Sequence, residues 1–287
     1  MKSGLAAIAS FALTAAIFSQ AFAQDRVVSV GGDITEIVYA LGEGDRLSAT
    51  DSTSVYPPEA LATPKVGYVR QLSAEGVLSL EPDLILISGA AGPPEALDQV
   101  RATGVPLIEM RTAYTVEAIL EKTRRVADAL NASEAGAALI ADIETDWRNA
   151  QDTMSTLGIA PSVLFFSTVG DGSARAGGDE TAAQGVIDLI GGVNVFGDRT
   201  GYKDLSLEAA IAADPDIILV MSHNVAQAGD LEKMMDHPAI SLTSAAQSGH
   251  VFVVDSVQIM QFGPRLPAAI SKLATEIEAA LADGDGA

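Results

Sequence analysis

Cysteine is absent from the 287-residue chain, and histidine occurs only three times. The lack of cysteine excludes disulfides, thiolate metal sites and cysteine nucleophiles. A lipoprotein carries its lipid on a cysteine at the cleavage site, so we expect a protein without a lipid anchor. The histidines, His223, His237 and His250, are too widely separated in sequence to suggest a histidine-rich metal site.

Basic residues are scarce as well. Lysine and arginine number 17 against 38 acidic residues, which gives a formal charge of −21. Nucleic acids and anionic membrane surfaces attract basic patches, so we expect neither as a partner and no membrane insertion. The chain contains no Gly-x-Ser-x-Gly, P-loop, His-Glu-x-x-His or dinucleotide-binding glycine motif. The sequence therefore does not predict an enzyme.

The N-terminus has the features of an export signal. Lys2 precedes an apolar run over residues 5–18, and Ala21-Phe22-Ala23 fits the small-x-small cleavage rule. The alternative, a membrane anchor, is less suitable because the run is short and polar residues follow it. We predict a signal peptide over residues 1–23, a mature chain beginning at Gln24, and localisation in a bacterial periplasm.

Two distant segments share one pattern of residues. The matched positions are Leu72 and Leu205, Ser73 and Ser206, Glu75 and Glu208, Pro82 and Pro215, and Asp83 and Asp216. In each copy the pattern predicts a serine-capped helix with a glutamate in its first turn, followed by a buried strand. Internal repetition of this kind predicts two similar lobes.

Apolar runs and helical spacing alternate along both halves of the chain. Strands are predicted over residues 26–30, 84–88, 105–109, 162–167, 217–221 and 251–254, and helices over 34–41, 94–103, 181–190 and 231–235. This alternation is typical of parallel sheets covered by helices. We therefore predict an α/β protein with two Rossmann-like lobes, residues 24–132 and 158–287. One long helix over 133–157 would join them and allow a modest rocking motion.

A tyrosine and an arginine stand just before the first repeat, at Tyr68 and Arg70. In an extended segment their side chains would point the same way, and the guanidinium would stabilise the phenolate. A phenolate is a hard oxygen ligand for ferric iron and a known axial ligand of haem. A packed Gly-Tyr turn is the alternative. The second copy is preceded by Tyr202-Lys203, so the two upstream segments differ.

Several motifs together resemble one known family. They are Gly31-Gly32-Asp33-Ile34-Thr35-Glu36, Tyr56-Pro57-Pro58-Glu59, Gly67-Tyr68-Val69-Arg70-Gln71-Leu72-Ser73, Leu189-Ile190-Gly191-Gly192-Val193-Asn194 and Phe262-Gly263-Pro264-Arg265. The chain resembles the haem-binding periplasmic proteins of bacterial haem ABC importers, within the class III superfamily that also carries siderophores and cobalamin. The resemblance covers essentially the whole mature chain. The Gly-Tyr-x-Arg-Gln-Leu-Ser segment is what points to haem.

The resemblance implies that Tyr68 ligates the haem iron and that Arg70 binds the phenolate or a haem propionate. Some relatives add a histidine from the second lobe, where this chain has Ser167-Thr168. Five-coordinate iron or a substitute ligand is therefore expected. The candidate substitute is His223, which follows the strand at 217–221. It would lie at the carboxyl end of that strand, the end at which α/β sheets bind ligands. The alternatives are that His223 lines the cleft without binding iron, or that it is solvated.

Other candidates concern the propionates and the transport partner. Arg175, Arg111 and Lys203 are possible cleft cations, against ordinary surface roles. The resemblance implies that Glu75 and Glu208 dock to arginines of an inner-membrane permease dimer, which works with its ATPase. Matched charges suit a pseudo-twofold partner, although first-turn electrostatics alone would also explain them.

The sequence thus predicts a periplasmic protein that carries haem as a transported ligand for iron acquisition. A ferric siderophore or cobalamin on the same scaffold is the alternative. Cobalamin pockets favour aromatic walls and catecholate siderophores favour several cations, whereas this chain has 5% aromatic residues and few basic ones.

Overall fold

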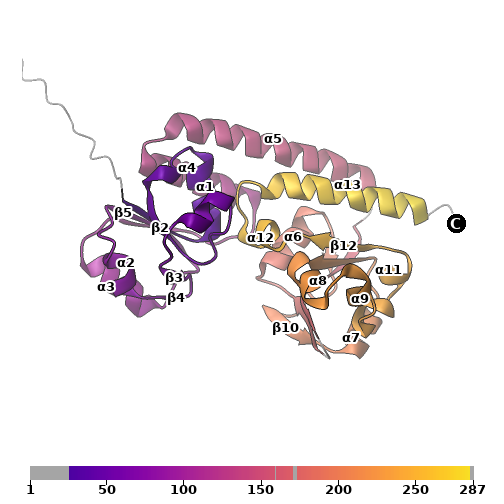
Figure 1. The fold of residues 1–287 in the computed structure, drawn as a ribbon. Helices are drawn as coiled ribbons and strands as arrows, with labels where there is room; N and C mark the ends of the chain where they lie inside the picture. The colour runs from indigo at the N-terminus through magenta and orange to yellow at the C-terminus, as the bar shows by residue number, and fades with distance from the viewer. Residues whose placement is uncertain (1–25, 159, 171–172, 285–287) are drawn as a thin grey trace, which may run out of the picture.

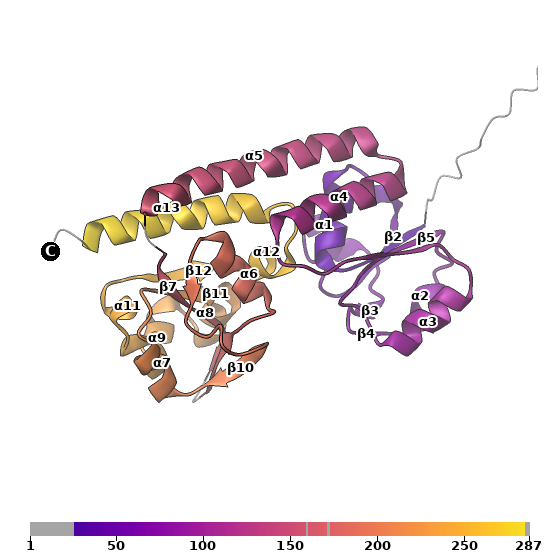
Figure 2. The same cartoon turned by 180° about the vertical axis from the view of Figure 1, so that it is seen from behind.

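The computed structural model describes residues 26–158, 160–170 and 173–284 of the chain (Figure 1). The predicted signal peptide lies outside the described residues. Two α/β units, each built on its own sheet, lie side by side, and the long helix α5 (Ser133–Leu157) runs across both of them (Figures 1 and 2).

The N-terminal sheet is entirely parallel. Its strands lie in the order β2 (Leu47–Thr50), β1 (Val27–Val30), β5 (Leu84–Ser88), β6 (Leu107–Met110). Residues of β1 and β5 are buried almost throughout, because helices cover both faces of a parallel sheet. The short helices of this unit are α1 (Gly32–Ala40), η1 (Gly44–Arg46), η2 (Pro58–Ala62), α2 (Ala74–Leu78) and α3 (Pro94–Ala102).

The C-terminal sheet is mixed. Its order is β10 (Tyr202–Leu205), β8 (Ser173–Gly177), β7 (Ser162–Gly170), β11 (Ile217–Met221), β12 (Val251–Val254), and β9 (Val193–Asn194) also pairs with β7. Pairings among β7, β9, β11 and β12 are parallel, as expected. The pairings of β8 with β7 and with β10 are antiparallel. Strand β7 continues three residues past the predicted end at 167, and this extension pairs with β8, the next strand in the chain.

Short helices surround this second sheet. They are α6 (Ala182–Leu189), α7 (Leu207–Ala213), α8 (Ser222–Ala228), α9 (Leu231–Met235), α10 (Pro238–Ser241), α11 (Ser244–Gln247) and α12 (Ser256–Gln261).

Three helices are longer than the rest of those described: α4 (Val116–Leu130), α5 (Ser133–Leu157) and α13 (Leu266–Gly284). Helices α5 and α13 pack along each other on one side of the molecule (Figures 1 and 2). Helix α4 begins in the core of the C-terminal unit, at Val116 and Ile119, and ends in that of the N-terminal unit, at Val126 and Leu130. Helix α5 also reaches both cores, because Leu139 packs against each of them. The units are therefore joined by more than the one long helix that the sequence predicted.

Candidate ligand-binding cleft

A small hairpin positions the tyrosine and the arginine of the candidate site. It consists of β3 (Gly67–Tyr68) and β4 (Gln71–Leu72), with Val69 and Arg70 in the turn. Val69 and Leu72 are buried, and both bond through their backbones to Gly92, with N–O distances of 3.0 and 2.8 Å. Tyr68, 43% exposed, and Arg70 are left on the open side of the hairpin.

Tyr68 and Arg70 line the same cavity, of about 210 Å³. Its opposite wall is Met260, Gln261 and Phe262, at the end of α12. Residues from the two halves of the chain therefore face each other across this cavity. Sequence reasoning placed Tyr68 and Arg70 together by strand alternation, whereas the structure brings them together through a turn.

A buried ion pair forms part of the cavity wall. Lys122, 5% exposed, bonds to the carboxylate of Asp33 and lies 3.4 Å from the backbone carbonyl oxygen of Phe262. Because Asp33 neutralises Lys122, the pair closes the cavity without offering a free cation. Lys122 was not predicted from the sequence, although Asp33 and Phe262 lie in two of the motifs that carry the family resemblance.

The predicted cleft cations divide into two groups. Arg70 lines the cavity, and no described residue forms a hydrogen bond or ion pair with its guanidinium. Arg111, Arg175 and Lys203 are exposed and are not among the residues that line it. Arg175 is instead held on β8, with its Nε 3.3 Å from Asp204 and with a 2.8 Å hydrogen bond to the carbonyl of Tyr202.

Tyr202 lies on the C-terminal side of the cleft, on β10. Its hydroxyl donates to the Met260 sulfur at 3.8 Å. Burial raises the pKa of this phenol, while its hydrogen bonds and the positive charge of Arg70 act in the opposite direction. Tyr202 therefore remains a neutral phenol at neutral pH.

His223 occupies the predicted position directly after β11, in the first turn of α8. Its Nδ1 lies 2.9 Å from the Ser256 hydroxyl, and the residue is half-buried. It is not among the residues that line the Tyr68 cavity. The other two histidines have local contacts: His237 caps α10, and His250 contacts the backbone carbonyl oxygen of Asp216 at 3.2 Å.

The repeated glutamates lie on matching helices. Ser73 accepts a hydrogen bond from a backbone N–H of α2, and Ser206 accepts the equivalent bond on α7, at 3.3 and 3.2 Å. Glu75 and Glu208 follow in the first turns, and both are exposed. Bonds from its own backbone N–H and from the Ser206 hydroxyl hold the pKa of Glu208 below its usual value. Figures 1 and 2 place α2 and α7 on the side of the molecule opposite α5 and α13.

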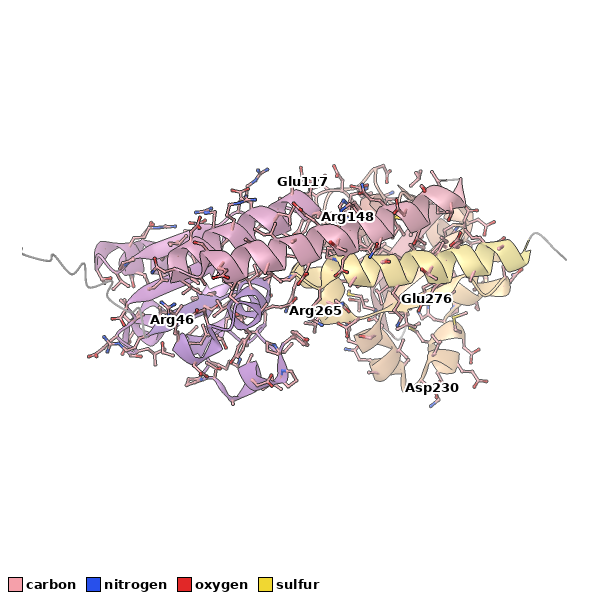
Figure 3. All side chains as sticks on the ribbon, turned by 90° about the horizontal axis from the view of Figure 1, so that it is seen from above. Arg46, Glu117, Arg148, Asp230, Arg265 and Glu276 are labelled. Atoms are coloured by element: carbon pink, nitrogen blue, oxygen red, sulfur yellow. The ribbon has the colours of Figure 1, made fainter. Side chains whose placement is uncertain are left out.

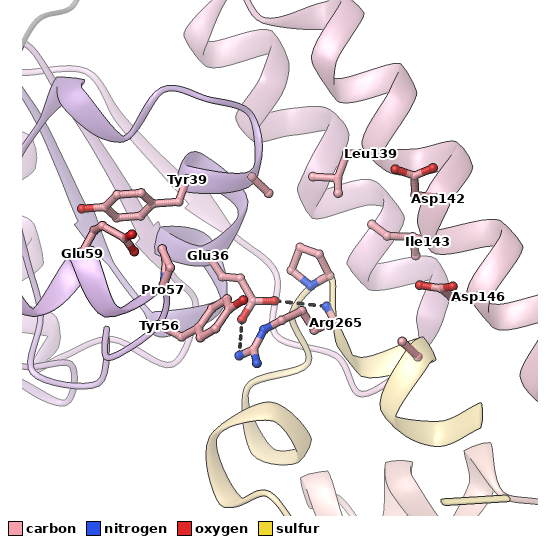
Figure 4. Close-up of a pocket in the computed structure, with 13 residues that line it drawn as sticks. Glu36, Tyr39, Tyr56, Pro57, Glu59, Leu139, Asp142, Ile143, Asp146 and Arg265 are labelled. Carbon is pink, nitrogen blue, oxygen red and sulfur yellow. Dashed lines mark hydrogen bonds and ion pairs between the residues drawn. The ribbon is translucent and has the colours of Figure 1, made fainter. Parts of the chain in front are cut away.

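A second, larger cavity of about 610 Å³ lies beside α5 (Figure 4). Its walls include Tyr39, Tyr56 and the ion pair of Glu36 with Arg265. None of the predicted ligand-binding residues lines it. We therefore take the smaller cavity, which holds Tyr68 and Arg70, as the candidate ligand site.

Two α/β lobes with a cavity lined from both halves of the chain define a ligand-binding protein of the two-lobed type. The chain belongs to the family described as periplasmic binding protein, which matches residues 27–257. The family consists of binding proteins, so this chain is a carrier and not an enzyme. It is a periplasmic substrate-binding protein of an ABC importer, which implies a permease partner. No helix in the described ranges has the length and apolar content required to cross a membrane.

Several relatives are similar over most of the chain. The periplasmic heme-binding protein RhuT from Roseiflexus sp. RS-1, in its apo form, is 36% identical with a TM-score of 0.82, covering 90% of this chain and 99% of that one. The periplasmic heme-binding protein BhuT in complex with two hemes is 37% identical with a TM-score of 0.83, covering 89% and 98%. The vitamin B12-binding protein of Vibrio cholerae is 26% identical over 274 residues, 93% of this chain and 94% of that protein.

Proposed function

We propose that this protein captures haem between its lobes and delivers it to an inner-membrane ABC permease. The observation that carries the proposal is the shared cavity of Tyr68 and Arg70, with Met260 on the opposite wall. A tyrosine oxygen is an established axial ligand of ferric haem, and a free guanidinium suits a propionate carboxylate. Arg70 is the cavity cation that remains free for this role among the described residues, since Lys122 is paired with Asp33.

The size of the cavity has a consequence for haem entry. Its 210 Å³ is below the roughly 300–1,000 Å³ typical of pockets for organic ligands. A porphyrin would therefore occupy the cavity only after the lobes have moved apart. Helices that reach both cores would limit this motion to a rocking of one lobe against the other.

The structures described as heme-binding proteins support haem, with 36% and 37% identity over about nine tenths of this chain. Cobalamin is the second candidate, because the Vibrio cholerae relative is a vitamin B12-binding protein. The cobalt of cobalamin carries its own axial ligands, so that substrate does not require an exposed tyrosine beside an arginine. A catecholate siderophore would require more free cations than Arg70 alone.

We propose that Glu75 and Glu208 dock the carrier onto a permease dimer. Both carboxylates are exposed and lie in the first turns of α2 and α7. These two helices lie on the same side of the two lobes (Figures 1 and 2). Equivalent charges on equivalent helices suit a partner with twofold symmetry. Because the chain contains no cysteine to hold a lipid, we also propose that the mature protein is free in the periplasm.

Ligand titration tests this function. Mature protein beginning at Gln24 is titrated with ferric haem, and cyanocobalamin and a ferric catecholate are titrated in parallel. We expect a saturable Soret band and a charge-transfer band typical of high-spin phenolate ligation with haem, and no saturable change with the other two. Saturable binding of cyanocobalamin without a haem complex would replace haem by cobalamin as the substrate.

A further inference from the structure

A short segment, the last two residues of α12 and the turn that leads to α13 (residues 260–265), contributes to both cavities. Met260, Gln261 and Phe262 line the Tyr68 cavity, whereas Pro264 and Arg265 line the larger one. Figure 3 shows Arg265 between the two lobes, near the start of α13. The position of this segment therefore determines the distance between Tyr68 and the opposite wall of the ligand cavity.

Arg265 fixes the segment to the N-terminal lobe. One guanidinium nitrogen lies 2.8 Å from a carboxylate oxygen of Glu36 on α1, and the Arg265 backbone N–H donates to the other oxygen at 3.1 Å. The guanidinium carbon lies 3.3 Å from the centroid of the Tyr56 ring. Figure 4 shows the arginine and the glutamate directly opposed, with Tyr56 beside them.

The burial of Glu36 makes this contact specific. Glu36 is 4% exposed, so its carboxylate has lost its hydration and depends on Arg265 for compensation. A planar guanidinium can bond to a carboxylate and stack on an aromatic ring at the same time, which a lysine ammonium does less well. Gly263 leaves room for this approach, because a Cβ there would lie 3.0 Å from a Glu36 carboxylate oxygen.

The other end of the segment has a second, independent contact with the N-terminal lobe. The side-chain amide of Gln261 donates to the carbonyl of Thr53 at 2.8 Å. The ring of Phe262 packs edge-on against Tyr114, with centroids 5.2 Å apart, and this contact anchors the segment in the core of the C-terminal unit. Glu36, Thr53 and Tyr56 precede α4 in the chain, whereas the segment itself follows the C-terminal sheet. The contacts of this short segment therefore fix the position of the C-terminal lobe relative to the N-terminal lobe.

We propose that Arg265 is a positioning residue for haem, acting through Met260, Gln261 and Phe262 without touching the ligand. This inference rests on the proposed function. Its ion pair with Glu36 sets the separation between the Tyr68 wall and the opposite wall, and so sets how long haem is retained. The pair does not determine which residue ligates the iron.

The rate of haem release tests the proposal. Ferric haem transfer from the carrier to excess apomyoglobin is followed for wild type, Arg265→Met and Arg265→Lys. We expect release to accelerate about tenfold or more in Arg265→Met, the range seen when supporting residues of a metal site are lost, with partial recovery in Arg265→Lys. The Soret position stays that of wild type because Tyr68 is intact. Arg148→Met is the matched control, since Arg148 is an exposed arginine of α5 whose one hydrogen-bond partner among the described residues is the nearby Thr145 hydroxyl.

The double variant Glu36→Gln with Arg265→Met guards against unfolding, because it leaves no unpaired buried charge. We expect it to fold and still release haem quickly. A lobe distance measured without haem gives an independent readout. The chain has no cysteine, so Glu95→Cys on α3 and Glu232→Cys on α9 allow two spin labels to be placed on exposed sites.

We expect a broader distance distribution between these labels when the double variant is introduced. A wild-type release rate together with a wild-type distance distribution would overturn the proposal. Failure of the wild-type protein to bind haem would refute the proposed function instead. The distance distribution would in that case still decide whether Arg265 sets the position of the lobes.

Discussion

At the scale of single residues, Tyr68 is the group on which haem ligation depends. We predict that Tyr68→Phe lowers ferric haem affinity by more than about 100-fold, since even indirect partners of a metal site are worth roughly 10–100-fold. The measurement is a haem titration followed at the Soret band. Because the Tyr68 side chain is 43% exposed, the variant should fold normally.

Two variants serve as controls for Tyr68. Tyr39→Phe removes a hydroxyl that contacts Thr63 beside the larger cavity, and it should bind haem as wild type does. His223→Ala should leave the ferric spectrum unchanged, because the His223 ring contacts Ser256 outside the Tyr68 cavity. If His223→Ala changed the spin state and Tyr68→Phe bound haem normally, the iron would lie on the His223 side of the cleft. That result would contradict ligation by Tyr68.

Arg70 is predicted to act on the ligand and not on the fold. Hydrogen bonds to charged groups contribute about 1.5–3 kcal/mol, so Arg70→Gln should weaken haem binding by about tenfold or more. The melting temperature should be unchanged, because no described side chain pairs with Arg70. Arg175→Gln is the comparison, since that arginine pairs with Asp204 and lies outside the cavity lining. Equal affinities in the two variants would contradict a role for Arg70 in binding propionate.

At the scale of elements, the strands that are short apolar runs were predictable, and the strands rich in small or polar residues were not. The bounds of β5, β11 and β12 agree with the sequence prediction because each is a short apolar run between turn residues. Strands β8 and β10 were missed, since Ser-Ala-Arg-Ala-Gly and Tyr-Lys-Asp-Leu lack such an apolar run. Strand β10 lies at the edge of the sheet, and β8 lies between β10 and β7. Helices α4 and α13 were also missed.

Some residues of the candidate site could be predicted from the sequence, and others could not. Tyr68 and Arg70 belong to one local motif, which a reader of the sequence can find. Lys122 and Met260 join them only after folding, because their partners are distant along the chain; Lys122 is 89 residues from Asp33. Local pattern contains no information about such pairs. The structure was needed to show that Arg70 enters the cavity whereas Arg175 and Lys203 do not line it.

The repeated helices α2 and α7 carry the prediction for transport. Glu75→Ala and Glu208→Ala should each reduce haem uptake in vesicles reconstituted with the permease, and the double variant should reduce it further. Haem affinity should not change, since neither residue lines the cavity. Glu95→Ala, in the first turn of α3, is a matched control. Normal uptake by the double variant would show that these carboxylates have only a local role in their helices.

The pH dependence of docking follows from Glu208. Its pKa is lower than that of an ordinary glutamate because its carboxylate accepts hydrogen bonds at the start of α7. The bonds to the ionised form are therefore present above the ordinary glutamate pKa and are lost only as the pH falls through the lowered value. We expect binding to permease-containing vesicles to stay constant from neutral pH to about pH 5, with a loss only in stronger acid. Ser206→Ala should move that loss to higher pH.

At the scale of the whole molecule, shared helices should make the two lobes one cooperative unit. Helix α4 contributes to both cores, and Leu139 of α5 packs against both. We predict a single calorimetric transition whose calorimetric and van't Hoff enthalpies agree. Ile143→Ala, at a site 2% exposed, should lower the free energy of unfolding by about 2–5 kcal/mol without splitting the transition. Two resolved transitions would mean that the lobes unfold independently.

Within the part of the chain that the structure describes, the glutamate-bearing helix occurs in both lobes, whereas the hairpin of Tyr68 and Arg70 occurs in the N-terminal lobe alone. A twofold-symmetric permease that contacts only Glu75 and Glu208 would bind the carrier equally well in two orientations related by a half-turn. Docking would then be degenerate, and productive encounters would be roughly twice as frequent as with one accepted orientation. A probe attached to a single lobe would report two docked populations of nearly equal size. The cargo would nonetheless enter from one side in half of the complexes and from the other side in the rest.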